Sequence, residues 1–435
     1  MFKTRFISML VLLAAVATGA VAQTTYKVSV KEGTDDATNW TIAPAEATTT
    51  GVAAGTTVTA TYGGVKKVKS VKAVKKAPAG PPSWKLTLSS PAKDLYITAN
   101  GGLIAQHTLD VASTEFTVEM PELTSQTVNI VATDGSGNCW YCTQENMSFA
   151  IGQTYQSSPT MTALGTESSA DVYKMTEAGT IPAGKTVVLS GVTISSGSII
   201  CSGNANIILM GSNSVTAAAN TAAIEIGGSG TTLTITGSGS LTVNGGSYAA
   251  AIGTGYANNA SVAGGNIEIN GGTITATGGQ SSAAIGTGYA YQNGSNECGA
   301  ITINGGTVTA YGGYAGIGTG GANQSSSNEC GDITINGGTV TATGGQRSAA
   351  IGTGYANNRG SNKCGTITIS TGVTSVTATM GNRSPNSIGK GFAVNGGTQT
   401  CGTITIGGTI YWDGSDYQND GEAYLGSVIT YPTAP

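Results

Sequence analysis

Residues 330–355 read CGDITINGGTVTATGGQRSAAIGTGY, and close variants of this phrase recur through the second half of the chain. The isoleucine of the Ile-Gly segment recurs at Ile252, Ile285, Ile317, Ile351 and Ile388. Successive members of this series are 33, 32, 34 and 37 residues apart. A fixed period of this length is typical of proteins built from stacked repeats. Each unit then buries its apolar face against its neighbours, so the repeat decides the fold.

Each long repeat contains three short runs of strand-forming residues separated by glycine-containing turns, for example at 301–303, 307–311 and 315–317. This pattern resembles the pectin-lyase-like family and predicts an all-β fold, a right-handed parallel β-helix of about seven to eight coils with three short strands per coil. We expect it to occupy residues 165–435. Helical repeats are excluded because no segment has a 3.6-residue period. A propeller, which needs four strands per blade, is the alternative.

The composition agrees with an all-β protein that carries few charges. Charged residues make up 10% of the 435 residues, 67 residues are glycine, and the net charge is −4. Thr, Val, Ile, Gly and Asn are abundant, and these residues favour strands and turns. Because nucleic-acid binding needs a basic surface, nucleic acid is not an expected partner.

The first 22 residues have the pattern of a cleavable secretion signal. Lys3 and Arg5 are followed by an apolar run, and Ala20-Val21-Ala22 is a small-residue cleavage site. No other segment is long and apolar enough for a transmembrane helix. The sequence therefore predicts a secreted or cell-surface protein.

Two small β-sandwich-like modules are expected between the signal and the repeats. They are predicted at 23–77 and 83–163, joined by a Pro-rich linker at 78–82. The runs 39–44 (NWTIAP) and 55–58 (GTTV) are similar to β modules that precede repeat domains in secreted and surface proteins of the Bacteroidales. The function of these modules stays open.

Four cysteines, each followed by glycine, occupy the same place in successive repeats. They are Cys298, Cys330, Cys364 and Cys401. Neighbouring coils lie about 4.8 Å apart, which is inside the Cα separation of a disulfide. The bridges Cys298–Cys330 and Cys364–Cys401 are therefore candidates, and a reduced, packed column of thiols is the alternative.

Three asparagines, Asn270, Asn304 and Asn336, follow the first strand of successive coils. We expect a structural ladder in which their side-chain amides pair with the coils above and below. The second strand carries Thr or Ser at alternate positions, as in Thr339-Val-Thr341-Ala-Thr343. Such an outward hydroxyl array resembles the surfaces of ice-binding β-solenoids, and it also follows from the β-propensity of threonine alone.

The loops after the Gly-Thr-Gly segments are rich in Tyr and Asn and should protrude from one side of the solenoid. Tyrosine rings stack on the apolar faces of sugars, and Asn side chains both donate and accept hydrogen bonds. The alternative is a tyrosine column that packs over the glycines of its neighbours. The glycan-binding candidates are Tyr256, Asn258, Asn259, Tyr289, Tyr291, Asn293, Tyr355, Asn357 and Asn358.

No catalytic site can be identified. The only histidine is His107, in the second β module, which removes most Ser-His, Cys-His and zinc schemes. The pectin-lyase-like resemblance would imply clustered Asp residues, calcium and an Arg or Lys base, and residues 190–410 contain no Asp cluster. No cofactor is expected, with calcium at Asp413, Asp416 and Asp420 as an alternative.

These observations favour a non-catalytic, adhesin-like protein whose partner is a polysaccharide or a cell-surface glycan. Two alternatives remain open. One is a structural stalk that displays the N-terminal modules, and the other is a polysaccharide lyase.

Overall fold

The computed structural model describes residues 80–100 and 102–432, and in the segment before them only the backbone of short strands between residues 10 and 72. The chain divides into two compact units, Met1–Gly80 and Pro81–Pro435. The predicted secretion signal and much of the first β module lie outside the described residues and stay predictions.

The described backbone of the first unit consists of short antiparallel strands. β1 pairs with β4, β3 lies between β2 and β6, and β7 lies between β5 and β8. Their bounds are β1 (Leu10–Val11), β2 (Ala14–Val16), β3 (Thr25–Lys27), β4 (Val30–Lys31), β5 (Trp40–Ala43), β6 (Val52–Ala53), β7 (Thr57–Tyr62) and β8 (Lys69–Lys72).

The second unit begins with a six-stranded sheet in the order β10-β9-β11-β12-β14, and β13 runs parallel to β9. Its strands are β9 (Ser83–Ala99), β10 (Gly102–Glu119), β11 (Leu123–Thr133), β12 (Cys139–Phe149), β13 (Thr154–Ser157) and β14 (Thr162–Ala163). Apolar and polar residues alternate along β9, so that Trp84 and Leu86 are buried while Lys85 and Thr87 are exposed.

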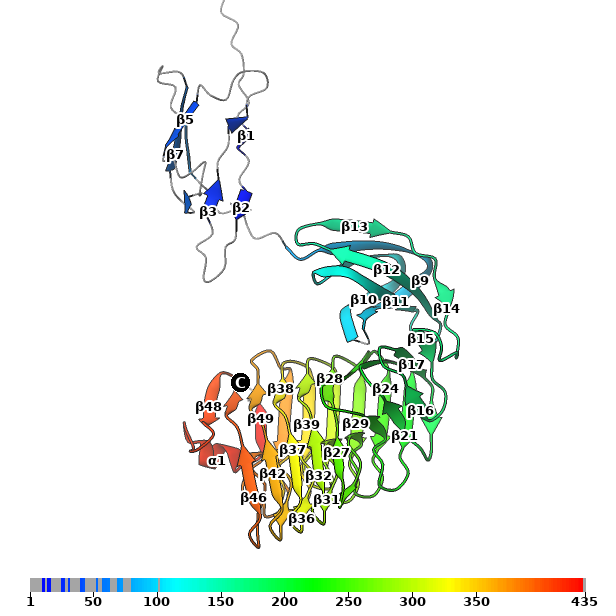
Figure 1. Cartoon of the computed structure of the whole chain (residues 1–435), viewed down its shortest axis with the longest axis vertical. Coiled ribbons are helices and arrows are strands. Elements are labelled where there is room, and N and C mark those ends of the chain that lie inside the picture. The colour runs from blue at the N-terminus through cyan, green and yellow to red at the C-terminus, as the bar shows by residue number, and fades with distance from the viewer. Residues whose placement is uncertain are drawn as a thin grey trace, which may run out of the picture. The chain divides into compact units, whose positions relative to one another are not determined.

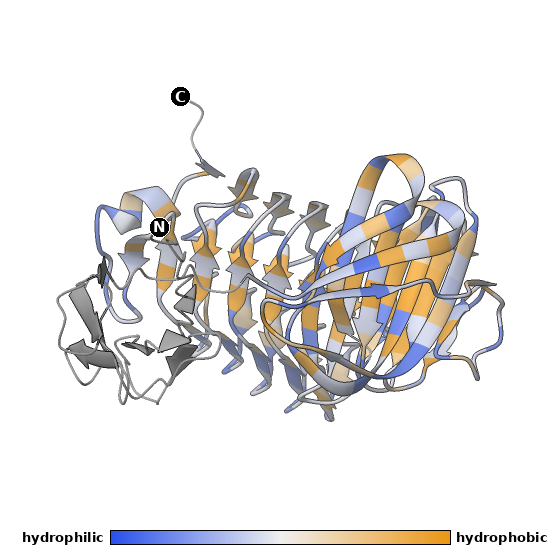
Figure 2. Ribbon diagram, turned by 90° about the horizontal axis from the view of Figure 1, so that it is seen from above, coloured by the Kyte–Doolittle hydropathy of each residue, from blue (hydrophilic) through white to orange (hydrophobic). Residues whose placement is uncertain are grey.

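The long strands β9 and β10 let this sheet fold over its own core. The first half of β9 pairs with β13, its second half pairs with β11, and the β9–β10 register shifts opposite Ala92, beside Pro91. Proline has no N–H for the ladder, so a change of register is expected there. The enclosed core contains Trp84, Leu95 and Phe116. Figure 2 shows that hydrophobic residues are frequent along the strands of this sheet.

The rest of the second unit is a stack of coils whose strands form parallel sheets (Figure 1). The first sheet has nine parallel strands, and β48 (Thr409–Trp412) closes it in the antiparallel direction. The nine are β15 (Val172–Lys174), β17 (Thr186–Ser190), β20 (Ala205–Met210), β23 (Thr232–Gly237), β28 (Asn266–Ile269), β33 (Ile301–Ile303), β38 (Ile333–Ile335), β43 (Ile367–Ile369) and β47 (Ile404–Ile406).

The second sheet follows the first along most coils, and β49 (Ile429–Tyr431) ends it in the antiparallel direction. Its parallel strands are β18 (Thr193–Ile194), β21 (Ser212–Thr216), β24 (Ser240–Asn244), β29 (Thr273–Thr277), β34 (Thr307–Tyr311), β39 (Thr339–Thr343) and β44 (Ser375–Thr379).

The third sheet completes the basic coil with eight parallel strands. These are β16 (Gly179–Ile181), β19 (Ile199–Cys201), β22 (Ile224–Ile226), β25 (Ile252–Gly253), β30 (Ile285–Gly286), β35 (Ile317–Gly318), β40 (Ile351–Gly352) and β45 (Ile388–Gly389).

The later coils add an outgoing and a returning strand between the third sheet and the next strand of the first sheet. We call this addition the fin. Its outgoing strands are β26 (Ala257–Asn258), β31 (Ala290–Tyr291), β36 (Ala322–Asn323) and β41 (Ala356–Asn357). Its returning strands are β27 (Ser261–Ala263), β32 (Ser295–Cys298), β37 (Ser327–Cys330), β42 (Ser361–Cys364) and β46 (Thr398–Cys401).

The predicted fold class is therefore confirmed: the chain is all-β, with parallel sheets stacked as the coils of a β-helix after an antiparallel sheet. One core runs through the coils, with in-register columns such as Ile303, Ile335 and Ile369. The expectation of three strands per coil holds for the early coils. It is wrong for the coils with the fin, because the inserted segment forms parallel ladders of its own; four of these coils have five strands and the last has four.

The antiparallel sheet packs on the outer face of the first coils. Tyr96 and Val131 of the sheet form a buried cluster with Val188, Ile208 and Met210 of the first parallel sheet. Strands β17 and β20 are therefore apolar on both faces, as expected for strands covered from both sides. The β module predicted at 83–163 and the repeat domain predicted at 165–435 both lie within the compact unit Pro81–Pro435.

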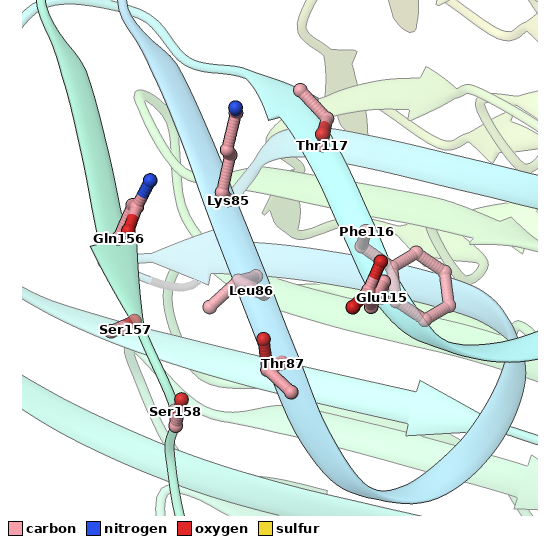
Figure 3. Close-up of a pocket in the computed structure, with 9 residues that line it drawn as sticks. All are labelled: Lys85, Leu86, Thr87, Glu115, Phe116, Thr117, Gln156, Ser157 and Ser158. Carbon is pink, nitrogen blue, oxygen red and sulfur yellow. The ribbon is translucent and has the colours of Figure 1, made fainter.

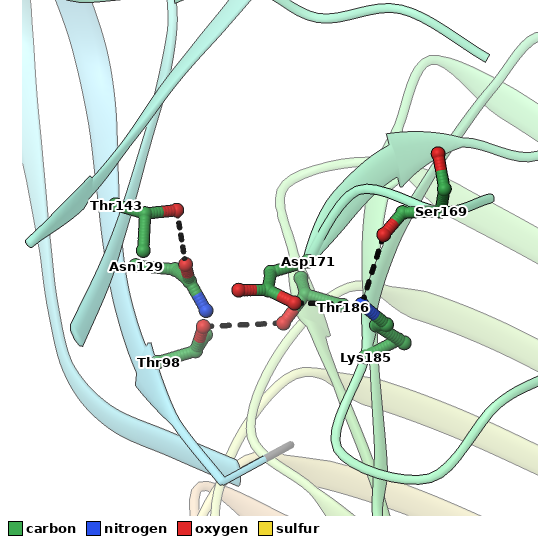
Figure 4. A network of polar contacts seen from close by, with 7 residues as sticks. All are labelled: Thr98, Asn129, Thr143, Ser169, Asp171, Lys185 and Thr186. Atoms are coloured by element: carbon green, nitrogen blue, oxygen red, sulfur yellow. Dashed lines mark hydrogen bonds and ion pairs between the residues drawn. The ribbon is translucent and has the colours of Figure 1, made fainter. Parts of the chain in front are cut away.

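Polar side chains accompany this contact. Thr98 and Thr186 share a hydrogen bond of 3.1 Å between their hydroxyls, and Lys185 pairs with Asp171 at 2.6 Å (Figure 4). Thr236 donates to Gln106 Oε1 at 2.9 Å. Thr98 and Thr186 are fully buried, so their shared bond satisfies groups that the packing removes from water.

The C-terminal end of the coil stack is closed by β48, the short helix α1 (Gly421–Leu425) and β49. Trp412, Leu425 and Ile429 cover the last coil and belong to the common core. Among the described residues, no helix has the length and hydrophobicity that crossing a bilayer requires.

Candidate functional site

The tip of the fin is a tight turn whose geometry explains several of the predicted glycan-binding asparagines. In one coil Gln292 and Asn293 have φ values of 49° and 61°, and Gly294 N donates to Tyr291 O at 3.0 Å. Two central residues with positive φ define a type I′ turn, in which asparagine is favoured. Asn358 (φ 45°) occupies the corresponding turn of a later coil, and Asn259 also has positive φ (49°).

A cluster of tyrosines lies where the fin leaves the coil. The rings of Tyr256 and Tyr289, from successive coils, stack with centroids 5.9 Å apart and an interplanar angle of 4°. Tyr248 contacts both rings at 5.2 and 5.6 Å, and Tyr291 stacks on Tyr289 at 5.9 Å. All four are half-buried. We call Tyr248, Tyr256, Tyr289 and Tyr291 the tyrosine cluster.

The cluster lies over backbone hydrogen bonds that join the start of the fin to the preceding coil. Tyr256 N donates to Asn220 O at 3.1 Å, and Tyr289 N donates to Tyr248 O at 2.8 Å, so that the outgoing strand bonds directly to the preceding coil. Burial raises the pKa of Tyr289 to about 12, and it also raises the pKa of Tyr256. Both phenols therefore stay neutral near pH 7 and can donate as well as accept hydrogen bonds.

Tyr355 was grouped with these tyrosines from the sequence, but the structure separates it from them. It is only 9% exposed, and the Arg347 guanidinium lies over its ring at 5.0 Å. Arg347 Nη1 also donates to the Tyr355 hydroxyl at 3.0 Å. This ring packs inside the protein and is not accessible to a sugar.

Two of the remaining candidates, Asn258 and Asn357, belong to a polar ridge along the fin. Asn258, Tyr291, Asn323 and Asn357 are register partners on successive outgoing strands. Asn323 Nδ2 donates to Tyr289 Oη at 3.1 Å, and Asn358 Nδ2 donates to Asn323 Oδ1 at 3.1 Å. The ridge thus offers side-chain amides and phenols that repeat from coil to coil.

Reasoning from the sequence missed a second asparagine column, inside the fin. Asn296, Asn328 and Asn362 are at most 1% exposed, and Gln399 continues their column. Asn328 Nδ2 donates to Gly321 O at 2.7 Å and to Asn362 Oδ1 at 3.2 Å. The signal was present, because Asn alternates with exposed residues in Ser-Asn-Glu-Cys and therefore points inward with the cysteine.

The four predicted cysteines are brought together. They are register partners on successive returning strands, and all of them are buried and unbridged. The thiols of Cys298 and Cys401 donate to Gly265 O and Gly365 O at 3.7 and 3.8 Å. They form the boundary between the fin and the common core.

The asparagine ladder predicted at Asn270, Asn304 and Asn336 is visible, and it lies on the outside of the coils. Asn304 Nδ2 donates to Asn270 Oδ1 at 2.8 Å, and Asn336 Nδ2 donates to Asn304 Oδ1 at 2.9 Å. Asn304 and Asn336 are exposed, so the amides join coils at the surface. The same outward column begins with Val188, Ile208 and Thr236 where the antiparallel sheet covers it, and becomes Asn where the cover ends.

The other chemical candidates do not form a site. Asp413 binds its own loop, accepting from Ser415 N and Asp416 N at 2.8 Å each, and these bonds lower its pKa to about 2. Within residues 80–432 no group of three or more His, Cys, Asp or Glu side chains is arranged for a metal ion, so the calcium alternative at Asp413, Asp416 and Asp420 has no geometric support. His107 packs edge-on against Phe116 at 6.0 Å.

Two further surfaces are uncharged or weakly charged. The outward side of the second sheet carries in-register threonines such as Thr275, Thr309 and Thr341. A cavity of about 410 Å³ lies on the antiparallel sheet, and its lining contains Lys85, Glu115, the apolar Leu86 and Phe116, and several polar residues (Figure 3). Lys85 and Glu115 are exposed, so this hollow is open to solvent.

The comparisons with known proteins bear on the repeats. A family model described as "Beta helix repeat" matches residues 267–289, 301–321 and 333–355. These stretches cover the three basic sheets of successive coils and stop at or just before the outgoing strands of the fin. Searches of curated proteins and of solved structures found no match. The second half of the chain is thus a β-helix repeat domain, and the fin strands lie outside the matched repeats.

Proposed function

We propose that this chain is a secreted or cell-surface protein that binds carbohydrate through the fin and has no catalytic activity. The observation that carries the proposal is the tyrosine cluster beside the polar ridge. Half-exposed aromatic rings next to neutral amides and phenols are the groups that contact the apolar faces and hydroxyls of sugars. The resemblance of the N-terminal modules to surface proteins of the Bacteroidales type supports an adhesin-like role.

The repeat suggests how weak contacts could add up. Asn258, Tyr291, Asn323 and Asn357 follow one another at the spacing of successive coils, about 4.8 Å. A polymer laid along the ridge would contact several of them at once, and linked weak contacts raise the overall affinity without any strong single contact. This arrangement favours an extended polysaccharide over a small sugar.

The test is binding of the full chain to a panel of immobilised polysaccharides. We expect retention on at least one polysaccharide, and a loss of at least tenfold in affinity for Tyr256→Ala/Tyr289→Ala, because each buried sugar–ring contact contributes about 1 kcal/mol. The matched control is Tyr311→Ala, since Tyr311 is 47% exposed on the second sheet, away from the fin.

The second candidate is a structural stalk, and a specific observation favours it. The faces of Tyr256 and Tyr289 are directed at each other, and the turn asparagines are accounted for by positive φ. If the chain is a structural stalk, Tyr256→Ala/Tyr289→Ala loses stability, and neither the parent chain nor this variant is retained on any immobilised polysaccharide. The proposed site would also be refuted if the double variant and Tyr311→Ala both bound the polysaccharide with the affinity of the parent chain.

A further inference from the structure

The column Cys298, Cys330, Cys364 and Cys401 carries an inference that does not depend on carbohydrate binding. The four residues lie directly opposite one another on β32, β37, β42 and β46, one on each of four successive coils. Register partners on parallel strands are about 4.8 Å apart, and disulfides span Cα separations of roughly 4.4–6.8 Å. The spacing of neighbouring coils therefore falls within the Cα range of a disulfide.

The thiols are shielded from solvent and lie next to one another along the column. They are between 1% and 7% exposed, and the apolar core of the coils lies beside them. Hydrogen bonding to Cys330 and burial raise the pKa of Cys298 and of Cys364, while the same hydrogen bonds lower the pKa of Cys330.

We propose that the column is a redox site at which two disulfides, Cys298–Cys330 and Cys364–Cys401, clamp neighbouring coils together. Only neighbours can bond, because residues two coils apart are separated by about 10 Å. This pairing is the one that uses all four thiols. A bridge between Cys330 and Cys364 would leave the two outer thiols without a reachable partner.

The chemistry requires an oxidant, which we take to be a disulfide of low molecular weight such as oxidised glutathione. The thiolate of one cysteine attacks the oxidant, forms a mixed disulfide and releases one thiolate of the oxidant. The neighbouring cysteine loses its proton and attacks the protein Sγ of the mixed disulfide, which forms the bond between the two cysteines and releases the second thiolate of the oxidant. Two electrons pass to the oxidant, and two protein thiols become one disulfide for each oxidant molecule reduced. Because the thiols are buried, the reaction proceeds through local separation of coils or before the coils close.

Proteolytic cleavage sites between the four cysteines allow their pairing to be determined from disulfide-linked peptides. Cutting after Glu297, Glu329 and Glu422 and after Lys and Arg places the four cysteines on separate peptides, 298–329, 330–347, 364–383 and 391–422. The full chain is incubated with oxidised glutathione until its free thiol count is constant, alkylated, digested without reductant and analysed by mass. We expect 298–329 linked to 330–347, and 364–383 linked to 391–422. Four alkylated cysteines, or a link between 330–347 and 364–383, would overturn the proposal.

Variants that lack two of the four cysteines give a second test, the change in thermal unfolding midpoint on oxidation. Thiols that only pack and never form a disulfide would give no such change. Oxidation should raise the midpoint of thermal unfolding of the parent chain by roughly 5–10 °C, reversibly with a thiol reductant. Cys298→Ala/Cys330→Ala should keep about half of this shift, because one bridge remains. Cys298→Ala/Cys364→Ala should show none, because its remaining thiols lie two coils apart. An equal shift in both variants would contradict the pairing.

Discussion

The glycines of the third sheet show how single residues decide whether the coils can stack. Gly253, Gly286, Gly318 and Gly352 are register partners with φ between 129° and 137°. A Cβ on Gly286 would lie 1.9 Å from the carbonyl oxygen of Gly318 on the next coil, and that oxygen already accepts from Thr287 N. Neither the conformation nor the space admits another residue.

We therefore predict that Gly286→Ala lowers the free energy of unfolding by at least about 3 kcal/mol, through backbone strain and the clash together. The control is Gly408→Ala, where φ is 85° but no atom lies within 4 Å of the new Cβ. This control should lose only about 1 kcal/mol. Urea denaturation compares the two, and an equal loss would show that the contact between coils does not matter.

The two asparagine columns make a second comparison between residues of one type. Asn328→Ala removes buried bonds to Gly321 O and Asn362 Oδ1, so we expect a loss of about 1–3 kcal/mol. Asn336→Ala removes exposed bonds that water can replace, and we expect a loss below about 0.5 kcal/mol. Denaturation of both variants measures the difference, and the reverse order would contradict the assignment of the inner and outer columns.

At this scale the sequence shows which residues stack but not which of them stay accessible. Tyr289 and Tyr355 occupy the same place in the repeat, and both were candidates for sugar binding. Their exposure differs because Arg347 of its own coil covers Tyr355, whereas the corresponding position in the coil of Tyr289 is Ser281. A side chain eight residues away therefore decides the outcome, and the repeat pattern alone does not reveal it.

The strands β17 and β20 carry the contact that joins the antiparallel sheet to the coils. Ile208 points away from the coil core, is fully buried and packs in the cluster that contains Tyr96 and Val131. Later strands of the same sheet have half-exposed threonine on their outward side, as at Thr334. The cover over the first coils thus depends on a few apolar side chains.

We predict that Ile208→Asp separates the antiparallel sheet from the coils, because an unpaired carboxylate would be buried in an apolar cluster. In calorimetry we expect the antiparallel sheet and the coils of the parent chain to unfold in one transition. In Ile208→Asp we expect them to unfold in two separate transitions. Thr334→Asp, an outward position of the same parallel sheet, is the control and should leave the trace unchanged. A single unchanged transition for Ile208→Asp would refute the role of this cluster.

The sequence already contained a signal for this contact. Val187-Val188-Leu189 and Ile207-Ile208-Leu209-Met210 are continuous apolar runs, which indicate strands buried on both faces, whereas later coils alternate as Ile-Thr-Ile. The same runs make the register ambiguous. Aligning the repeat by sequence places Met210 opposite Ile235, but the structure pairs Ile235 with Ile207, because nothing in an uninterrupted apolar run marks which residue faces inward.

Across the whole β-helix, every column discussed above depends on the same property. Residues one repeat apart in the sequence are neighbours on successive coils, whether they are cysteines, asparagines, tyrosines or glycines. The period and the parallel coils could be predicted from the sequence because stacking requires like residues at like positions. The fin could be recognised as an insertion, but its buried amides and its ridge depend on how the outgoing and returning strands meet.

The most direct test of this stacking is a set of distances along one column. Glu268, Thr334, Thr368 and Thr405 occupy corresponding outward positions of the first sheet. Dipolar electron paramagnetic resonance, with one spin label at position 268 and the other at 334, 368 or 405, measures their separations. We predict about 10, 14 and 19 Å, in equal steps of about 4.8 Å per coil. Separations that do not rise by one equal step per coil would contradict the stacked architecture and every neighbour relation derived from it.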